Sequence, residues 1–253
     1  MIGSKVIELV AIGSTNTYAG ELFANNDFED GTIIWAHEQF AGRGQHDHTW
    51  NSETGKNLTL TVCLKPRFLA PEKQFQLNKA IALGLLDFIQ YYTILLPRVM
   101  RHESHIKWPN DIYLGDRKIG GILIDNRIMG AKFETSFVGI GFNINQTRFA
   151  PDIPNPVSLI QILGRETLLR DALVLLCSFL DNRYEAIKQM HFTGIDQEFG
   201  QSLLGFDQWR YFLLDNAPLE GKIRGVDPSG RLMLENRNGE TLFFGHGEIE
   251  FIL

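Results

Sequence analysis

The sequence contains little cysteine and no excess of positive charge. Only Cys63 and Cys177 occur among its 253 residues, and each lies inside a hydrophobic run. Two such thiols favour buried, reduced cysteines over a disulfide framework, as in a reducing cytoplasm. The 30 acidic residues outnumber the 24 lysines and arginines, and the formal net charge is −6. This balance provides no basic surface of the kind that binds nucleic acid.

A long hydrophobic run is also missing. The longest apolar stretch, residues 79–96, contains Asp87, Gln90 and two tyrosines, so it predicts a helix packed on a core rather than a membrane span. The N-terminal residues MIGSKVIELVAIGST show no basic leader followed by a sustained hydrophobic core, so no signal peptide is predicted. We therefore expect a cytoplasmic protein that has no membrane partner.

What is present is a mixture of strand-like and helix-like patterns. Short hydrophobic or alternating runs predict strands at 7–12, 32–36, 57–64 and 133–145, and amphipathic patterns predict helices at 17–24, 75–94 and 170–190. From about residue 205, short alternating runs separated by Asp-Pro-Ser-Gly and Asn-Arg-Asn-Gly predict a small all-β unit. The expected fold class is α+β, with a mixed sheet and helices in residues 1–204 and an all-β domain in residues 205–253.

Residues 41–50, AGRGQHDHTW, predict a loop that can close over an anion. Gly42 and Gly44 have no side chain to keep a ligand away, and their N–H groups can face negative charge. Arg43 offers planar donors that suit a carboxylate or a phosphate, and Trp50 can stack on a purine. A solvated turn whose tryptophan anchors the core is the alternative that these residues leave open.

A β-hairpin is predicted within residues 106–126, with its turn at Gly115-Asp116. Because side chains alternate along a strand, we expect one face of the returning strand to carry Lys118, Gly120, Ile122 and Ile124.

Several polar residues around this hairpin are candidates for a site. An unpaired ammonium on a sheltered strand is costly, so either a ligand anion or a salt bridge with Asp111 or Asp116 is expected to neutralise Lys118. Asn110 and Asp111 can orient a phosphate or magnesium, or can form Asx turns after the preceding proline. Asn143 can likewise reach a metal or phosphate oxygen, or simply satisfy the neighbouring backbone.

Five motifs, taken together and in this order, make the sequence resemble the biotin protein ligases, which attach biotin to carrier domains of carboxylases. They are Ser-Thr-Asn at 14–16, Gly-Arg-Gly at 42–44, Lys-Trp-Pro-Asn-Asp at 107–111, Lys-x-x-Gly at 118–121 and Gly-x-Gly-x-Asn at 139–143. Gly-Arg-Gly or Gly-x-Gly alone is a weak signal, whereas Lys-Trp-Pro-Asn-Asp in this company is specific. The match spans about residues 7–253, and it implies a class II synthetase-like catalytic domain followed by an SH3-like β-barrel.

The resemblance implies an ATP-dependent ligase that works in two steps. The carboxylate of biotin attacks the α-phosphorus of ATP, which gives biotinyl-5′-AMP and pyrophosphate. A lysine of a biotin carboxyl carrier protein domain then takes the biotinyl group and releases AMP. ATP and biotin are the implied substrates, and Mg²⁺ is the implied metal ion. A lipoate ligase, which shares the architecture, and a non-catalytic sensor of biotin or its adenylate are the alternatives.

The functional residues of the family carry over to the matching positions of this sequence. The implied biotin-binding residues are Ser14, Thr15, Asn16, Gln39, Gly42, Arg43, Gly44, Gln45, Lys118, Gly121, Gly139 and Gly141. The implied adenylate-binding residues are Arg43, Gly44, Trp50, Asn110, Lys118 and Asn143, and Asn143 is also the candidate magnesium ligand. The implied catalytic residues are Lys118, Arg43 and Asp111, the last as the group that accepts the proton of the attacking amine.

The sequence departs from the family directly after Gly-Arg-Gly, where many relatives continue with more arginine and a glycine. Gln45 stands where an arginine often helps to hold the adenylate, and Asp47 adds negative charge nearby. We therefore expect biotinyl-AMP to be retained less tightly than in arginine-rich relatives. If His46 or His48 must be protonated, binding will also depend on pH.

The resemblance also bears on the partners of the protein. The first predicted strand begins within the first ten residues, which leaves no room for the N-terminal helix-turn-helix that some relatives carry. Together with the acidic balance, this predicts an enzyme that does not bind DNA. An exposed sheet edge could pair with a second copy, as in some relatives, so a homodimer is left open.

Overall fold

The central feature of the fold is a seven-stranded sheet. The computed structural model describes residues 1–25, 28–45, 49–94, 96–97, 102–130, 132–151 and 153–252. In it the strands follow the order β1-β2-β3-β7-β6-β5-β4. β1 and β2 are parallel, and every other pair of neighbours is antiparallel. The strands are β1 (Val6–Ile12), β2 (Thr32–Gln39), β3 (Leu58–Leu64), β4 (Ser104–Lys107), β5 (Asp111–Leu114), β6 (Arg117–Met129) and β7 (Lys132–Phe142).

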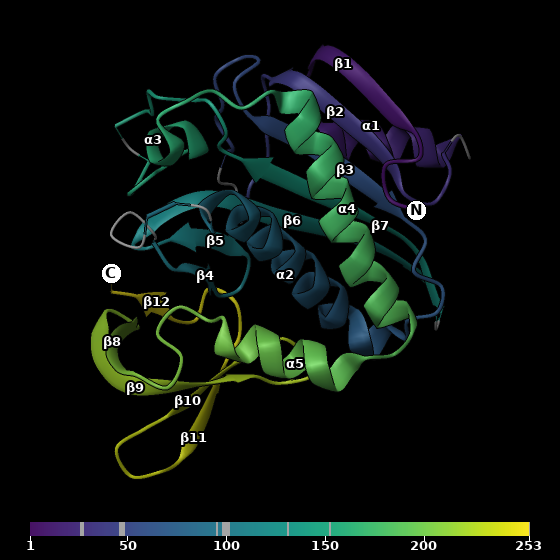
Figure 1. The fold of residues 1–253 in the computed structure, drawn as a ribbon. Helices are drawn as coiled ribbons and strands as arrows, with labels where there is room; N and C mark the ends of the chain where they lie inside the picture. The colour runs from purple at the N-terminus through teal and green to yellow at the C-terminus, as the bar shows by residue number, and fades with distance from the viewer. Residues whose placement is uncertain are drawn as a thin grey trace.

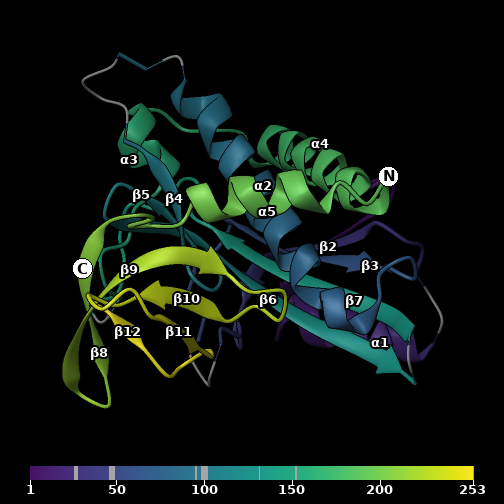
Figure 2. The same cartoon turned by 90° about the horizontal axis from the view of Figure 1, so that it is seen from below.

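Helices cover both faces of this sheet. α1 (Thr15–Ala24) contacts β2, β3 and β7 on one face, and α2 (Gln74–Thr93) and α4 (Leu169–Lys188) lie over the other (Figure 1; Figure 2). All seven residues of β3, LTLTVCL, are buried as a consequence. Since its threonines alternate with apolar residues, they share one face of the sheet, and that face proves to be the one that carries the site.

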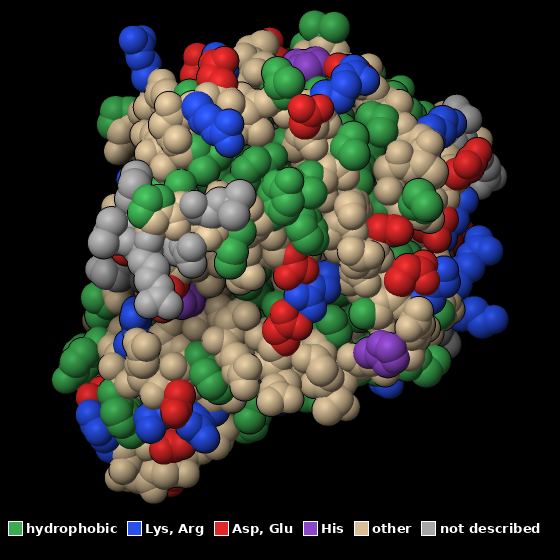
Figure 3. Space-filling view, viewed as in Figure 1, with side chains coloured by type: hydrophobic (Ala, Val, Ile, Leu, Met, Phe, Trp, Pro, Cys, Tyr) green, Lys and Arg blue, Asp and Glu red, His purple; other side chains and the backbone are tan. Residues whose placement is uncertain are grey.

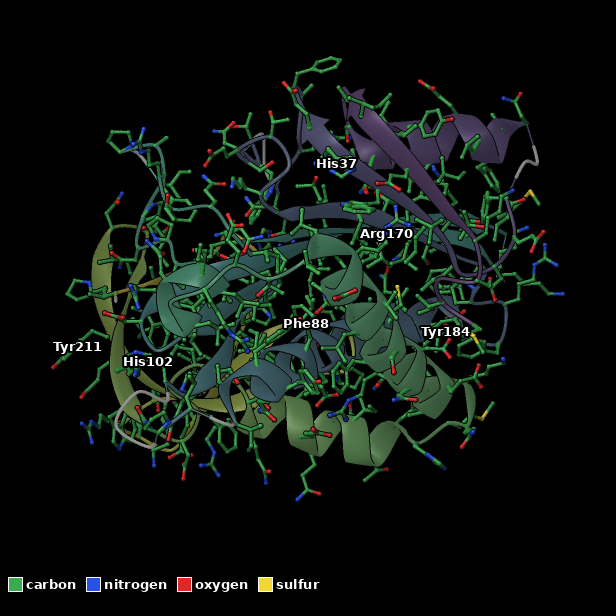
Figure 4. All side chains as sticks on the ribbon, turned by 45° about the horizontal axis from the view of Figure 1, so that its top comes forward. His37, Phe88, His102, Arg170, Tyr184 and Tyr211 are labelled. Carbon is green, nitrogen blue, oxygen red and sulfur yellow. The ribbon has the colours of Figure 1, made fainter. Side chains whose placement is uncertain are left out.

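The two long helices pack against each other as well as on the sheet. The buried residues of α4 form one stripe with a helical period, and they are Ala172, Leu173, Leu176, Cys177, Leu180, Tyr184 and Ile187. Phe88 of α2 and Tyr184 of α4 are both buried (Figure 4). Hydrophobic side chains also reach the surface where the upper parts of the two helices meet (Figure 3). The helices predicted at 75–94 and 170–190 are confirmed within two residues at each end.

Short helical segments were missed by the sequence patterns. They are the 3₁₀ turn η1 (Pro71–Lys73), α3 (Leu159–Leu163) and α5 (Phe192–Gln201). α5 depends on tertiary contacts, since its Asp196 carboxylate accepts a hydrogen bond at 2.6 Å from the buried ammonium of Lys79 on α2. Across the described residues, no helix combines the length and the apolar character needed to cross a membrane.

A second, five-stranded sheet follows in the order β11-β10-β9-β8-β12, and all its pairings are antiparallel. Its strands are β8 (Trp209–Leu214), β9 (Ala217–Val226), β10 (Leu232–Glu235), β11 (Thr241–Phe244) and β12 (Glu250–Phe251). The predicted α+β class is confirmed, including the all-β character of the C-terminal residues.

The second sheet is attached to the edge of the first. Ile106 of β4 donates its backbone N–H to Ser202 and accepts one from Leu204, at 2.8 and 2.9 Å. The indole N–H of Trp108 donates to the carbonyl of Gly230 at 2.9 Å. The Trp108–Gly230 hydrogen bond crosses the predicted division between residues 204 and 205, and that division stays a prediction.

The β5–β6 hairpin has its predicted turn but not its predicted face. Lys118 and Gly120 of β6 pair with consecutive residues of β5, so Ile119 is an extra residue that forms a β-bulge. Lys118 therefore shares a side with Gly121, where a Cβ atom would lie 3.7 Å from Lys118 Cε. A Cβ on Gly120 would instead strike the ring of Phe142, at 2.7 Å. The prediction that Lys118 shares a face with Gly120, Ile122 and Ile124 is wrong, because the bulge reverses the alternation.

The two cysteines are free and buried, as predicted. Burial raises the pKa of Cys63 to about 12 and that of Cys177 to about 11. Both thiols are therefore protonated and unreactive near neutral pH.

Candidate functional site

A cavity of about 510 Å³ opens between the beginning of α1, the 39–50 segment, the β5–β6 hairpin and the second sheet. All but two of the predicted site residues line it. These are Ser14, Thr15, Asn16, Gln39, Arg43, Gly44, Gln45, Trp50, Asn110, Asp111, Lys118, Gly121, Gly139 and Gly141. Residues separated by more than a hundred positions in the sequence thus meet in one hollow, which none of the motifs could establish alone.

One end of the cavity, here called the inner end, is formed by Ser14, Thr15, Asn16 and Gln39. Ser14 precedes α1 in an extended conformation, and its side chain makes no capping hydrogen bond. The side-chain carbonyl oxygen of Gln39, Oε1, accepts the backbone N–H of Thr15 at 2.8 Å. The amide N–H groups of Gln39 are consequently left as donors. The inner end presents neutral hydrogen-bonding groups, which suit an uncharged polar ligand such as a urea.

A network of hydrogen bonds supports the inner end from below. The hydroxyl of Thr61 on β3 lies 2.8 Å from the hydroxyl of Thr15 and donates to Oδ1 of Asn16. The side-chain NH₂ of Asn16 lies 3.3 Å from both the carbonyl of Leu123 and a carboxylate oxygen of Asp125. Both ends of the Asn16 amide are therefore engaged by the protein, which gives Asn16 a supporting position behind Thr15. Thr61 was missed, although the leucine–threonine alternation of β3 placed it on this face.

Glycines form the floor of the cavity because other residues of the protein occupy the space that a Cβ atom would need at these positions. A Cβ on Gly139 would lie 2.6 Å from Oδ1 of Asn16, and one on Gly141 would lie 2.2 Å from Cε2 of Trp50. A Cβ on Gly121 would reach Asp111, Trp50 and Lys118 at 3.4 to 3.7 Å. The glycines at 139 and 141 of β7 thus let other parts of the protein approach the sheet closely.

The other end, here called the outer end, carries charge and is formed by Arg43, Lys107, Asp111 and Lys118. Lys118 forms a salt bridge of 2.6 Å with Asp111, and the two side chains are 27% and 21% exposed. Of the alternatives left open for Lys118, the salt bridge is therefore present and Asp111 is its partner. The ammonium also lies 5.9 Å from the ring centre of Trp50. At one place, therefore, Lys118 can bind an anion and Asp111 can accept a proton from the group that reacts with it.

The glycine–arginine segment forms a clasp beside the charged end. The N–H of Trp50 donates to the carbonyl of Gly42 at 3.0 Å, and Arg43 pairs with Thr49 as an isolated β-bridge. Gly42 itself does not line the cavity, since a Cβ there would lie 2.4 Å from the carbonyl oxygen of Trp50. Its glycine is required by the clasp, whatever ligand is bound. His46, Asp47 and His48, on which the predicted pH dependence rests, lie outside the described residues.

The predicted magnesium ligand lies away from the cavity. Asn143 is 5% exposed, is not part of the cavity lining, and donates its side-chain N–H to Val157 at 3.0 Å. In the parts of the chain that the structure describes, no three His, Cys, Asp or Glu side chains group to hold a metal ion. Mg²⁺ therefore stays a prediction, and the position of Asn143 does not support it as the ligand. Asn110 does line the cavity, while its NH₂ donates to the carbonyl of Ile122.

The second sheet contributes a wall that the sequence did not indicate. His246, Gly247, Ile249, Glu250 and Phe251 line the cavity opposite the hairpin. No local signal marked them, because they belong to a short β-strand and the turn before it, more than a hundred residues from the motifs. Lys107, by contrast, lies in the Lys-Trp-Pro-Asn-Asp motif, in which Asn110 and Asp111 were the residues predicted to act in the site.

Comparison with known proteins shows the family and the fold. The model of the Biotin/lipoate A/B protein ligase family matches residues 9–143. The Bifunctional ligase/repressor BirA of Bacillus spizizenii is 29% identical over 246 residues, which cover 94% of this chain and 72% of that protein. The Biotin--[acetyl-CoA-carboxylase] ligase of Paracoccus denitrificans is 28% identical over 84% of this chain and 90% of that protein. A solved structure, the biotin protein ligase from Aquifex aeolicus in complex with biotin and ATP, shares the fold with a TM-score of 0.79. It is 22% identical, and the match covers 98% of this chain and 99% of that one.

Proposed function

The chain belongs to the Biotin/lipoate A/B protein ligase family, and from this premise we propose that it is an ATP-dependent biotin ligase. The observation that carries the proposal is one cavity with a neutral, hydrogen-bonding end and a charged end. Biotin has the same division, since its ureido ring is neutral and its carboxylate is anionic. In this orientation the ring occupies the inner end and the carboxylate lies beside Lys118.

The first step of the proposed reaction takes place at the charged end. A carboxylate oxygen of biotin forms a bond to the α-phosphorus of ATP, and the bond between that phosphorus and the bridging oxygen breaks to release pyrophosphate. Negative charge grows on the phosphoryl oxygens, where Lys118 and Arg43 supply cationic donors. The ring of Trp50 lies over Gly141 and close to Lys118, so it is within reach of a nucleotide bound at the charged end. The bound adenylate also has to be kept from hydrolysis, which requires the site to exclude water.

The second step needs a neutral amine. The amine of a carrier-protein lysine forms a bond to the acyl carbon of biotin, AMP leaves with the bonding pair, and the nitrogen loses a proton. Asp111 is proposed to accept that proton. Its carboxylate is held by Lys118 at 2.6 Å, so this role requires the salt bridge to loosen once the adenylate neutralises Lys118.

The same cavity distinguishes biotin from lipoate. A dithiolane ring has no strong hydrogen-bonding group, and it would offer nothing to the hydroxyl of Ser14 or to the amide N–H groups of Gln39, which the protein leaves for a ligand. The inner end therefore favours a ureido ring over the ring of lipoate.

The proposed partner is the biotin-accepting carrier domain of a carboxylase. We also propose that the protein works in the cytoplasm without nucleic acid or membrane. Homodimerisation through β1 is a further proposal, supported by the edge position of that strand and by the exposure of Val6 and Val10.

The test is an incubation of the protein with ATP, Mg²⁺, labelled biotin and a biotin carrier domain. A ligase labels one lysine of the carrier and consumes ATP, whereas a non-catalytic sensor binds biotin and leaves the carrier unlabelled. Labelled lipoate in place of biotin serves as the control for the related chemistry. Carrier labelling with lipoate alone would overturn the proposal.

A further inference from the structure

Lys107 is a cavity residue to which no role has been given. It is the last residue of β4, directly before the cis peptide bond between Trp108 and Pro109. Its side chain lines the cavity and is half-buried. The ammonium lies 5.7 Å from the ring centre of Tyr113 and 5.6 Å from that of Phe251. Two aromatic rings, one from each sheet, thus hold this cation at the junction of the sheets.

Within the part of the chain that the structure describes, the ammonium of Lys107 lacks a counter-ion of its own. Among the described residues, no hydrogen bond or ion pair ends at its Nζ atom. Asp111 pairs with Lys107 in the register of β4 and β5, but its carboxylate is bonded to Lys118 at 2.6 Å. Glu250 also lines this wall and acts on Lys107 only at longer range. A half-buried cation without a direct partner is costly, so this corner of the cavity favours an anion.

The charges around Asp111 suggest which anion. Lys118 and Lys107 both face Asp111, so two ammonium groups share one carboxylate at the charged end. If Lys118 meets the α-phosphate of ATP, as the proposed function requires, the next phosphates of the chain need a second cation close by. Lys107 is the cavity-lining lysine that remains for this purpose among the described residues.

We propose that Lys107 binds the β- and γ-phosphates of ATP and holds the pyrophosphate that leaves. As the bond between the α-phosphorus and the bridging oxygen breaks, the electron pair passes to that oxygen, and the ammonium of Lys107 stabilises the charge there. The inference rests on the proposed function, because it requires an adenylation step. It adds a residue specific to the first step, since the second step involves no pyrophosphate.

The experiment compares the two half-reactions in Lys107→Gln, which removes the charge and keeps most of the side-chain length. We expect the inhibition constant of magnesium pyrophosphate and the KM for ATP each to rise about tenfold, as for the loss of one charged hydrogen bond. Transfer from preformed biotinyl-AMP to the carrier should keep its rate within about twofold, because no pyrophosphate takes part. Lys107→Arg should restore most of the pyrophosphate inhibition.

The matched control is Lys73→Gln, which alters an exposed lysine that also lies over an aromatic ring, at 4.5 Å from the ring centre of Phe192. It should change neither half-reaction. If Lys107→Gln leaves the pyrophosphate inhibition constant unchanged, or lowers both half-reactions equally, the proposal is wrong. If the wild-type protein makes no biotinyl-AMP at all, it is the proposed function that fails instead.

A second measurement uses the wild-type protein and does not depend on the folding of a variant. Lysines are acylated with acetic anhydride, with and without magnesium pyrophosphate, and the modified positions are read by mass spectrometry. Pyrophosphate should protect Lys107 and leave Lys73 as reactive as before. Equal acylation of Lys107 in both samples would overturn the inference.

Discussion

The two ends of the cavity differ in how their polar groups are satisfied. At the inner end, a chain of hydrogen bonds joins Thr15, Asn16, Gln39 and Thr61. The side chains of Thr15, Asn16 and Gln39 are therefore already oriented without a ligand. At the outer end, cations outnumber the carboxylate that lies among them, and the side chains are partly exposed. The inner end is therefore preorganised by the protein, whereas the excess of cations at the outer end favours binding of an anion.

This difference assigns a separate task to each end. A preorganised neutral pocket selects a ligand by shape and hydrogen bonding, with little reorganisation on binding. A cluster in which cations outnumber the carboxylate among them acts on negative charge that develops during a reaction. Substitutions at the inner end should therefore change binding and stability, and those at the outer end should change the rate of adenylation.

The largest effect is expected from Lys118→Ala at the outer end. Loss of this ammonium should lower the rate of biotinyl-AMP formation by roughly 10²- to 10³-fold, because the growing phosphoryl charge loses its nearest cation. The rate is measured as pyrophosphate release in a single turnover, and folding is checked by circular dichroism. Lys5→Ala, at an exposed lysine far from the cavity lining, is the control. Near-normal adenylation by a folded Lys118→Ala protein would remove Lys118 from the mechanism.

Gly139→Ala should weaken biotin binding at the inner end selectively. The added methyl would lie 2.6 Å from Oδ1 of Asn16, so the network must move away from β7. We expect the dissociation constant for biotin to rise roughly tenfold or more, as for a polar site moved out of position, while ATP binding changes little. Gly194→Ala is the control, since a Cβ there meets nothing within 4 Å. Equal losses for biotin and ATP would contradict the division between the two ends.

Thr61→Val tests whether the network also stabilises the fold. The substitution removes the buried hydroxyl that donates to Asn16, and it leaves that acceptor unsatisfied. We expect the free energy of unfolding to fall by about 1–3 kcal/mol, measured by urea titration. Thr241→Val, at an exposed position of β11, should change it by less than about 0.5 kcal/mol. An unchanged stability of Thr61→Val would show that the network forms only with ligand.

The smallest effect is expected from Gln45→Arg, which adds a cation beside the charged end. Gln45 lines the cavity and is only partly buried, so the added charge should slow the dissociation of biotinyl-AMP by about two- to fivefold, as for exposed ion pairs. Dissociation is followed between pH 6 and 8 for both proteins. In the wild-type protein the dissociation of biotinyl-AMP should slow toward pH 6 if His46 or His48, which follow Gln45 in the sequence, must be protonated. A slow and pH-independent dissociation in the wild-type protein would count against both expectations.

Much of the fold was predictable because periodicity records burial. The apolar spacing of α2 and α4 and the fully buried run of β3 indicated their elements closely. α5 was not predicted, since a ten-residue helix with two glycines depends on its contacts with α2. The face of Lys118 was predicted wrongly because a bulge at Ile119 follows from the pairing of two strands.

The site was predictable to the extent that its chemistry lies in short motifs. Ser-Thr-Asn, Gly-Arg-Gly and Lys-x-x-Gly all supplied residues that line the cavity. Asn143 belongs to such a motif and yet points to Val157. A spacing thus identifies a strand that passes the site, but not which of its side chains face it.

The sequence by itself determined the α+β class, the apolar strands and long helices, and the kinds of donor and cation available for a biotin ligase. Only the tertiary structure decided that Thr61 supports the inner end, that Lys107 has no direct counter-ion among the described residues, and that His246, Gly247 and residues 249–251 line the cavity. The reason is physical. Periodicity and residue type report how each segment meets water, whereas the partner of a hydroxyl or an ammonium is set by chain segments that are distant in sequence and meet only when the core packs.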